Sequence, residues 1–355
     1  MVVKLVLEDG AFFEGKSFGA DTAVSGEVVF NTGMVGYTES LTDPIYRGQI
    51  LVLTYPLIGN YGVPGEDKDE FELLKFFESE KIQVSGLVIS DYSEEFSHWN
   101  AKKSLTNWMK ENNVPGIYGI DTRMLTKKLR EKGVMLGKIV NEQDIEINDP
   151  NLRNLPADVS TKEKIVYNKG GSKKIVLVDC GAKLSIIRSL AKRDCEVIRV
   201  PWNYDFFKDE ELYFDGIVIS NGPGDPKMCK ETIKNVSAAL EKGIPTFGIC
   251  LGNQILALAA GGDTYKLKYG HRSQNQPCVD KKTERCYITT QNHGYAVKSK
   301  TIPKQWKEWF VNANDGTNEG IMHKTKPFFA VQFHPEHLPG PKDCEFLIDK
   351  FVNML

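Results

Sequence analysis

The sequence predicts an α/β protein with two domains: an N-terminal α+β domain and a C-terminal domain built on a doubly wound parallel sheet. At 355 residues the chain is long for a single domain. Residues 146–172 are polar and rich in turn formers, which is typical of an interdomain linker. From Lys174 onward, short apolar strands alternate with helices, the pattern of right-handed βαβ units. We therefore expect domains at residues 1–145 and 173–355, joined by that linker.

The overall composition excludes several classes of function. A net charge of −2 predicts no electrostatic attraction to nucleic acid or to an anionic membrane. No apolar run approaches bilayer-spanning length, and the N-terminus lacks the pattern of a secretion signal. The seven cysteines are scattered without a Cys-x-x-Cys pair, which favours free thiols, a reducing compartment and a cytoplasmic location. Neither zinc-ligand spacing nor a His-Glu-x-x-His motif occurs, so we expect no protein-bound metal.

The first domain is predicted to mix strands with amphipathic helices. Leu5–Gly10 and Phe12–Gly15 indicate a hairpin, because an Asp-Gly turn separates two apolar segments. The other elements are predicted from their periodicity, as strands at 27–30 and 49–54 and helices at 69–81, 101–112 and 122–132. Gly133 is expected to end the last helix.

The second domain is predicted to place its active edge at the carboxyl ends of parallel strands. Its expected strands are 175–179, 196–200, 214–220 and 244–249. Its expected helices are 183–192, 228–242 and 251–260. Ligands bind such sheets outside the carboxyl ends of the strands. One loop that should lie there, Ser220–Pro226, holds two glycines and two prolines. A nucleotide-phosphate loop is disfavoured, since the Lys-Ser/Thr pair and the Gly-x-Gly-x-x-Gly spacing are lacking.

Gly248–Gly252 has the form Gly-x-Cys-x-Gly and follows a short apolar strand. This spacing is typical of a nucleophile elbow, in which small neighbours allow a sharp strand-to-helix turn. The helix N-terminus would favour a thiolate at Cys250, and its free backbone N–H groups could hold an oxyanion. The alternative is that Cys250 is a small buried hydrophobic residue, as most lone cysteines in apolar segments are.

A further apolar strand begins near Phe329 and ends in His334-Pro335-Glu336. A carboxylate beside an imidazole can fix its tautomer and stabilise its protonated form, so His334 could act as a general base for a thiol. A strand-end histidine in a solvated turn is the alternative for His334 alone. The placement of Cys250, His334 and Glu336 after strands of one sheet favours catalysis.

These motifs resemble a known family. Asn221–Pro226, Gly248–Gly252 and His334–Glu336 are similar to the three signatures of class I, triad-type glutamine amidotransferases. Gln291–Tyr295 and, in the first domain, Gly36–Pro44 resemble the small, glutamine-hydrolysing subunit or domain of carbamoyl phosphate synthetase. The resemblance covers essentially the whole chain and implies a β/β/α-type first domain followed by a flavodoxin-like second domain.

The resemblance also implies roles for individual residues. Cys250 would attack the carboxamide of L-glutamine, His334 would move the proton, and Glu336 would support the imidazole. The remaining implied substrate-binding residues are Gly222 and Leu251, whose backbone amides would hold the oxyanion, and Gly224, Gln254, Asn292, Gly294 and Tyr295. Ammonia would pass to a carbamoyl phosphate synthetase large subunit or fused synthetase domain for pyrimidine or arginine synthesis. The chain itself would need no cofactor.

Three residues depart from the family pattern: Asn253 replaces a usual histidine, Ile45 a usual glutamine-contacting serine, and Ser273 a usual glycine. Two alternatives to a glutaminase therefore remain. One is a non-catalytic regulatory or scaffolding subunit. The other is a stand-alone cysteine hydrolase, such as a peptidase, which would leave the first domain unexplained.

Overall fold

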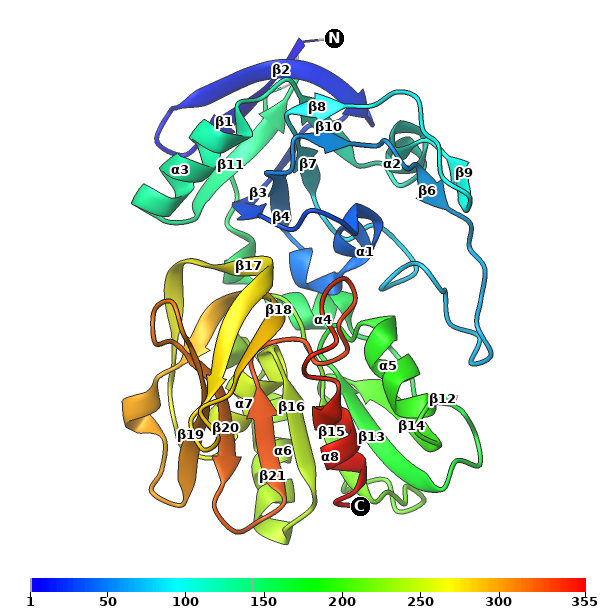
Figure 1. Cartoon of the computed structure of the whole chain (residues 1–355), viewed down its shortest axis with the longest axis vertical. Coiled ribbons are helices and arrows are strands. Elements are labelled where there is room, and N and C mark those ends of the chain that lie inside the picture. The colour runs from blue at the N-terminus through cyan, green and yellow to red at the C-terminus, as the bar shows by residue number, and fades with distance from the viewer. Residues whose placement is uncertain (1, 142–143) are drawn as a thin grey trace. The chain divides into compact units, whose positions relative to one another are not determined.

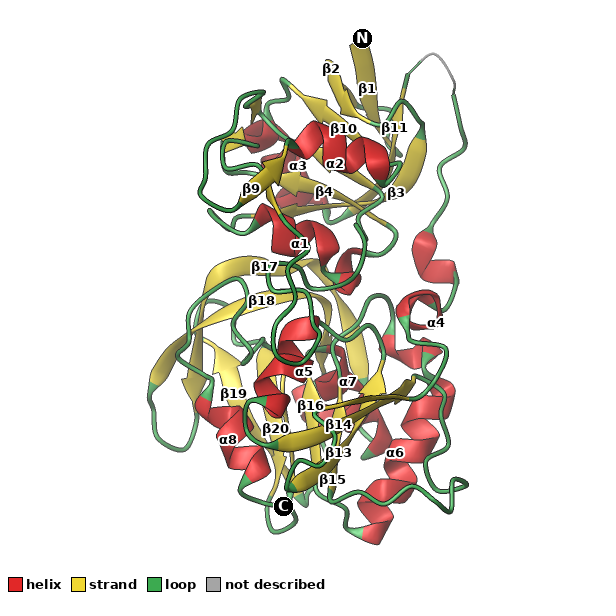
Figure 2. Ribbon diagram, turned by 90° about the vertical axis from the view of Figure 1, so that its right-hand side faces the viewer, coloured by secondary structure: helices red, strands yellow, loops and turns green. Residues whose placement is uncertain are grey.

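A computed structural model of the chain describes residues 2–141 and 144–355. The chain divides into two compact units, Met1–Arg153 and Asn154–Leu355, whose elements are drawn in Figures 1 and 2. Met1 and residues 142–143, which belong to the predicted first domain, lie outside the described residues. Part of the predicted linker is structured: it contains helix α4 (Leu155–Val159) and strand β12 (Ile165–Tyr167).

The first unit is built around a closed seven-stranded barrel of order β1-β11-β3-β4-β7-β10-β2. The barrel strands are β1 (Val2–Leu7), β2 (Phe12–Gly19), β3 (Val24–Asn31), β4 (Gln49–Leu53), β7 (Gly86–Val88), β10 (Pro115–Tyr118) and β11 (Met135–Val140). Strands β3, β4, β7 and β10 run parallel to one another, and the other pairings are antiparallel. Two short pairs lie outside the barrel: β5 (Leu57–Ile58) with β8 (Asp91–Tyr92), and β6 (Val63–Pro64) with β9 (Ala101–Lys103).

The predicted hairpin at the start of the chain is confirmed. In β1 the side chains of Val3, Leu5 and Leu7 are buried while their neighbours are more exposed, as expected for a strand with one face on the core. The turn to β2 uses Gly10 at φ 83°, a conformation that glycine adopts without strain. The alternation of apolar residues and the Asp-Gly turn therefore both predict the hairpin that the structure shows.

The helices of the first unit are α1 (Tyr37–Thr42), α2 (Leu105–Glu111) and α3 (Thr122–Lys132), with a 3-10 turn at Pro44–Tyr46. Helix α3 matches its predicted bounds, because Asp121 caps its start and Gly133 ends it at φ 110°. The helix predicted at 101–112 is shorter than expected. Residues 101–103 form β9, and Ser104 caps the helix by accepting a hydrogen bond from Asn107 N.

The helix predicted at residues 69–81 is wrong, since this segment forms turns instead. The Asp69 carboxylate accepts hydrogen bonds from the backbone amides of Phe71 and Leu73, at 2.9 and 3.0 Å. Such local bonds compete with helical hydrogen bonding. Glu72 has φ 61°, which interrupts a right-handed helix. The apolar side chains that suggested a helical face, such as Leu73 and Phe77, are nevertheless buried.

The second unit contains a ten-stranded sheet of order β12-β14-β13-β15-β16-β21-β20-β19-β17-β18. Besides β12, its strands are β13 (Lys173–Asp179), β14 (Cys195–Pro201), β15 (Gly216–Ile219), β16 (Thr246–Ile249), β17 (Thr264–Asp280), β18 (Cys286–Val297), β19 (Trp306–Asn312), β20 (Asn318–His323) and β21 (Phe328–Val331). Strands β14, β13, β15, β16 and β21 are parallel, in the doubly wound order typical of flavodoxin-like folds. The predicted parallel sheet is confirmed. The antiparallel extension through β20, β19, β17 and β18 is not anticipated by the sequence analysis.

Helices cover both faces of this sheet, as a doubly wound fold requires. The helices are α4, α5 (Leu184–Ala191), α6 (Lys230–Lys242), α7 (Leu251–Ala259) and α8 (Phe346–Val352). On one face, Ile219 of β15 packs in an apolar cluster with residues of α6 and α7, including Val236 and Leu256. On the other, the rings of Phe247 and Phe329 contact Phe351 of α8. Figures 1 and 2 show these helices around the strands.

Candidate active site

Cys250 stands in a sharp turn between β16 and α7. Both elements are labelled in Figure 1. Its backbone has φ 56° and ψ −102°, a conformation that residues with side chains rarely adopt. The turn also requires glycine on both sides. A Cβ on Gly248 would lie 2.4 Å from the carbonyl oxygen of Gly252, and a Cβ on Gly252 would lie 2.2 Å from that of Ile219. The chain thus has the strand–turn–helix conformation expected of a nucleophile elbow.

The sulfur of Cys250 is buried and makes two polar contacts. Sγ donates to the backbone carbonyl oxygen of Asn292 at 3.6 Å, and the side-chain Nε2 of Gln332 donates to Sγ at 3.7 Å. Cys250 is also the N-cap residue of α7. The free backbone N–H groups and the positive dipole at this end favour negative charge on the sulfur or on a bound oxyanion.

His334 and Glu336 lie just beyond β21, the strand that pairs with β16. Nδ1 of His334 and Oε1 of Glu336 are 2.6 Å apart, and both side chains are buried. In the described part of the chain, Nε2 of His334 has no hydrogen-bond partner. The carboxylate therefore fixes the ring so that Nε2 is available for a proton from another group.

The pKa values of this pair move apart for identifiable reasons. Burial and the positive charge of Lys183 both lower the pKa of His334. The Glu336 carboxylate outweighs them, and the Cys250 side chain adds to its effect, so the pKa of His334 is raised to about 10. Burial raises the pKa of Glu336, but the positive charges of Lys183 and His334 outweigh it and lower the pKa well below 4.5. The ionised carboxylate therefore favours the protonated form of the imidazole, so a proton that passes from the Cys250 thiol to His334 is held there as part of an imidazolium–thiolate pair.

Lys183 is a functional residue that the sequence analysis misses. Its Nζ lies 3.0 Å from Oε1 of Glu336, and the side chain is only 2% exposed. Its backbone N–H donates to the side-chain oxygen of Asn221 at 3.1 Å, so it also contacts the loop after β15. Lys183 comes four residues after β13. A polar residue after a parallel strand at this sheet edge is the signal that could have indicated it.

Asp179, the last residue of β13, fixes the turn that carries Lys183. One carboxylate oxygen accepts the amides of Gly181 and Ala182, at 2.8 and 2.7 Å. The other is 2.8 Å from Nε of Arg199 on β14. Because Asp179 is fully buried and its carboxylate is hydrogen-bonded on both oxygens, the turn is held firmly against the sheet.

Most of the predicted glutamine-binding residues lie around Cys250. A Cβ on Gly222 would be 2.8 Å from the Leu251 side chain, which places the loop after β15 against the elbow. Nε2 of Gln254 donates to the carbonyl oxygen of Tyr295 at 2.8 Å, and Asn292 accepts from Cys250 as described. Of the other two predicted residues, Gly294 lies on β18 between Asn292 and Tyr295, whereas Gly224, at φ 79°, lies nearest to Leu155 of α4.

Two family models together match nearly the whole chain. Residues 176–354 match the model described as glutamine amidotransferase class-I. Residues 5–139 match the model described as carbamoyl-phosphate synthase small chain, CPSase domain. The chain is also 51% identical over 354 residues to the carbamoyl phosphate synthase arginine-specific small chain of Neurospora crassa, covering 98% of this chain and 78% of that protein.

This chain belongs to the carbamoyl-phosphate synthase small chain family.

Longer relatives match this chain over only a small part of their own length. The chain is 55% identical over 354 residues to multifunctional protein CAD of Squalus acanthias, covering 98% of this chain and 16% of that protein. It is 54% identical over 355 residues to the mitochondrial carbamoyl-phosphate synthase [ammonia] of Homo sapiens, covering 99% of this chain and 23% of that protein. A solved structure of a glutamine amidotransferase from Thermotoga maritima matches 52% of this chain and 84% of that chain, with 18% identity and a TM-score of 0.38.

The three residues that depart from the small chain family pattern have different surroundings. Asn253 is fully buried, and its Nδ2 donates to Oε1 of Gln332 at 3.2 Å. Ser273 is buried on β17, where its hydroxyl accepts a hydrogen bond from Gln276 at 2.8 Å. Ile45 is buried within the first unit, in the 3-10 turn that follows α1. Two of the three residues, Asn253 and Ser273, therefore form hydrogen bonds with neighbouring side chains.

His271, His293 and Glu319 form a buried cluster of candidate metal ligands at β18. The candidate ligand atoms of His271, His293 and Glu319 lie up to 4.8 Å apart. Ligand atoms around tetrahedral zinc are about 3.4 Å apart, given bond lengths near 2.1 Å. The side-chain oxygen of Gln291 also contacts both rings, at 3.1 and 2.9 Å. The arrangement is therefore better explained as a hydrogen-bond network that supports β18.

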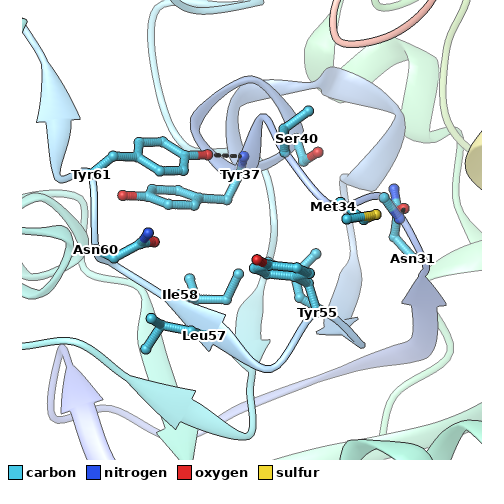
Figure 3. Close-up of a pocket in the computed structure, with 12 residues that line it drawn as sticks. Asn31, Met34, Tyr37, Ser40, Tyr55, Leu57, Ile58, Asn60 and Tyr61 are labelled. Carbon is cyan, nitrogen blue, oxygen red and sulfur yellow. Dashed lines mark hydrogen bonds between the residues drawn. The ribbon is translucent and has the colours of Figure 1, made fainter. Parts of the chain in front are cut away.

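The first unit has a separate small pocket of about 150 Å³ beside α1 (Figure 3). The rings of Tyr37 and Tyr61 stack there with centroids 4.0 Å apart, and the Tyr61 hydroxyl accepts the backbone amide of Tyr37 at 2.9 Å. Burial raises the pKa of both tyrosines, so their hydroxyls stay protonated. Because both hydroxyls bond to backbone groups near the start of α1, these residues fix the start of that helix.

None of the helices in the described ranges, 2–141 and 144–355, is long and apolar enough to cross a membrane.

Proposed function

We propose that this chain is the glutaminase component of a glutamine-dependent carbamoyl phosphate synthetase. In this proposal it hydrolyses L-glutamine and supplies ammonia to a synthetase large subunit or fused synthetase domain. The observation that carries the proposal is the buried His334–Glu336 pair beside a strained, buried Cys250. Membership of the small chain family supports the assignment of glutamine as substrate.

Amide hydrolysis would proceed in two covalent steps. The thiol proton of Cys250 first moves to Nε2 of His334, whose raised pKa favours the imidazolium, and the thiolate Sγ then attacks the carboxamide carbon. The backbone amides of Leu251 and Gly222 would hold the oxyanion. The C–N bond then breaks, and His334 returns the proton to the departing nitrogen, which leaves as ammonia.

The second step removes the thioester. Water loses a proton to His334 and attacks the thioester carbon, the C–S bond breaks, and the sulfur of Cys250 regains the proton. Glutamate is released. Throughout both steps Glu336 and Lys183 hold the imidazole in place, since both are buried and paired.

The glutamine would be held by Gly224, Gln254, Asn292, Gly294 and Tyr295, as the family resemblance implies. The partner would use the ammonia with bicarbonate and ATP. The carbamoyl phosphate would feed pyrimidine or arginine synthesis, as the family resemblance implies, and the name of one relative, an arginine-specific small chain, supports the arginine route. No cofactor, nucleic acid or membrane partner is part of this proposal.

The compartment is also inferred. Each of the seven cysteines is a free thiol, which supports a reducing environment. The cytoplasm remains the predicted location. The mitochondrial name of the human relative makes the mitochondrion the alternative.

The test is to measure carbamoyl phosphate formation by the chain together with its synthetase partner, using either glutamine or ammonium chloride. We expect Cys250→Ala to abolish glutamine-dependent synthesis and to leave ammonia-dependent synthesis unchanged. Cys286→Ala, at an exposed cysteine, is the matched control and should change neither. Glutamine-dependent synthesis that survives Cys250→Ala would refute the mechanism.

A non-catalytic scaffolding subunit is the second candidate, favoured by the apolar Ile45 where the family usually has a serine. The same assay separates the two. A native complex that makes carbamoyl phosphate from ammonium chloride but releases no glutamate from saturating glutamine would support the scaffold.

A further inference from the structure

Gln332 links the nucleophile to a predicted glutamine-binding residue. It is fully buried and lies between the end of β21 and His334. Its Nε2 donates to Sγ of Cys250 at 3.7 Å. Its Oε1 accepts from Asn253 at 3.2 Å and from Gln254 at 3.1 Å. One side-chain amide therefore contacts three groups of the elbow and the helix that follows it.

The orientation of this amide is fixed by a chain of hydrogen bonds. The carbonyl oxygen of Tyr295 can only accept, so the group of Gln254 that lies 2.8 Å from it must be the NH₂. That same NH₂ contacts Gln332, which must therefore present its oxygen to Gln254. The NH₂ group of Gln332 is then left to face the sulfur of Cys250. Flipping Gln332 would bring donor against donor at Gln254.

We propose that Gln332 is a further catalytic residue, which stabilises the thiolate of Cys250 by donating a hydrogen bond to it. This inference rests on the proposed function. In the resting thiol, Sγ donates its proton to the carbonyl oxygen of Asn292. Once the proton has moved to Nε2 of His334, the sulfur can only accept, and the side-chain amide of Gln332 is a neutral donor within reach, in addition to the imidazolium. The bond is then charge-assisted and stronger.

Asn253 contributes indirectly, by holding the side chain of Gln332 in position. Its Nδ2 supplies one of the two hydrogen bonds that hold Oε1 of Gln332, and the residue is fully buried. The requirement at position 253 is therefore a donor to this oxygen. An imidazole N–H can meet the same requirement, which accounts for asparagine standing where the family usually has histidine. Asn253 is a positioning residue, because it acts through Gln332.

The titratable groups that face Cys250 are few. His334 is the one whose charge state depends on the thiol proton, with Glu336 and Lys183 behind it. From β18, the neutral His293 is buried beside Asn292, and burial lowers its pKa well below 6.5. Substitution of Gln332 leaves all of these groups in place. A change in sulfur reactivity in such a variant is therefore attributable to the lost amide.

The first experiment compares Gln332→Met with Gln83→Met in the complex with the synthetase partner. Gln83 is a buried glutamine of the first unit that bonds to Ser79, so its variant controls for the loss of a buried amide. The rate of Cys250 alkylation by iodoacetamide is followed by mass spectrometry across pH. We expect the midpoint of the alkylation profile to move about one pH unit or more upward in Gln332→Met, with no movement in Gln83→Met. Glutamine hydrolysis should fall about 10- to 100-fold in kcat/KM.

An alkylation profile of Gln332→Met that coincides with the native profile would overturn the proposal. If native protein fails to hydrolyse glutamine but the profile still moves, the proposed function fails and the role of Gln332 on the sulfur stands. If glutaminase activity is normal in the native complex and unchanged in Gln332→Met, only the role of Gln332 fails.

A second pair of variants covers the case in which Gln332→Met does not fold. Asn253→His keeps a donor to Oε1 of Gln332, whereas Asn253→Leu removes it. We expect Asn253→Leu to move the alkylation midpoint upward, by less than Gln332→Met, and Asn253→His to restore the native value. Equal profiles for the two variants would contradict the positioning role.

Discussion

At the scale of single residues, the site depends on one carboxylate between two cations. Oε1 of Glu336 lies 2.6 Å from Nδ1 of His334 and 3.0 Å from Nζ of Lys183, and all three side chains are buried. Breaking a buried pair by removing one partner leaves an uncompensated charge. The effect of any substitution here is therefore set by which charge remains.

Glu336→Gln removes the carboxylate and keeps the shape of the side chain. Burial and Lys183 both lower the pKa of His334, and in this variant the Glu336 charge no longer opposes them. We expect the pKa of His334 to fall from about 10 to below 6.5, measured by NMR of labelled histidine, and glutamine hydrolysis to fall about 100-fold or more. Glu111→Gln, on the surface of the first unit, is the control. An unchanged histidine titration in Glu336→Gln would show that another group sets this pKa.

The pair also makes stability depend on pH. The raised pKa of His334 gives a contribution that is complete below 6.5 and is lost as pH rises through about 10. The lowered pKa of Glu336 gives a contribution that is complete above 4.5 and is lost as pH falls toward the lowered value. We expect the difference in free energy of unfolding between native protein and His334→Gln to shrink between neutral pH and pH 10 in urea titrations. If the difference in free energy of unfolding instead grows over this range, folding does not raise the pKa of His334.

At the scale of elements, the site forms because β15, β16 and β21 are parallel neighbours whose carboxyl ends share one edge. The sequence predicts this, because each apolar strand is followed at once by a motif with special chemistry. Lys183 and Gln332 were not predictable in the same way. Each is an ordinary polar residue whose role depends on a tertiary contact, with Glu336 and with Cys250 respectively.

The antiparallel half of the sheet was also missed, for a physical reason. Strands β17 and β18 are long and paired, but their pairing slips between Lys266 and His271 and again between Ser273 and Gln276. Such irregularities disturb the alternation of apolar and polar residues on which strand prediction depends. The false helix at 69–81 has a related cause, since the Asp69 bonds that oppose it leave no trace in periodicity.

The elbow gives a prediction at this scale. In Gly252→Ala the new Cβ would lie 2.2 Å from the backbone oxygen of Ile219, and backbone cannot yield as a flexible side chain can. We expect the free energy of unfolding to fall by about 3 kcal/mol, measured by urea denaturation. Gly65→Ala is the control, because its nearest neighbour, at 3.3 Å, is the side chain of Lys102. A Gly252→Ala protein as stable as Gly65→Ala would mean that the packing at the elbow is looser than described.

At the scale of the whole molecule, the chain carries seven thiols of unequal reactivity. Burial raises the pKa of Cys195 to about 11 and that of Cys344 to about 12, and it raises the pKa of Cys278 further. These buried side chains therefore stay protonated near neutral pH. Cys286, by contrast, is exposed, and Cys250 lies at a helix N-terminus beside a strong base.

We expect a limiting amount of iodoacetamide to label Cys250 and Cys286 and to spare Cys195, Cys278 and Cys344, because the thiolate is the reactive form. Peptide mapping by mass spectrometry gives the distribution. In a Cys286→Ala protein, loss of glutaminase activity should follow labelling of Cys250 in equal proportion. Loss of activity that instead follows labelling of Cys195, Cys278 or Cys344 would point to a different nucleophile.

The positive φ of Cys250 has a consequence for attempts to make this chain more heat-resistant. With ψ at −102°, the residue lies outside the left-handed helical region as well, so glycine would occupy position 250 with less strain. A screen that rewards survival at high temperature alone would therefore tend to discard the sulfur. Directed evolution of this protein must score turnover alongside robustness, or it will select a sturdier but inert variant.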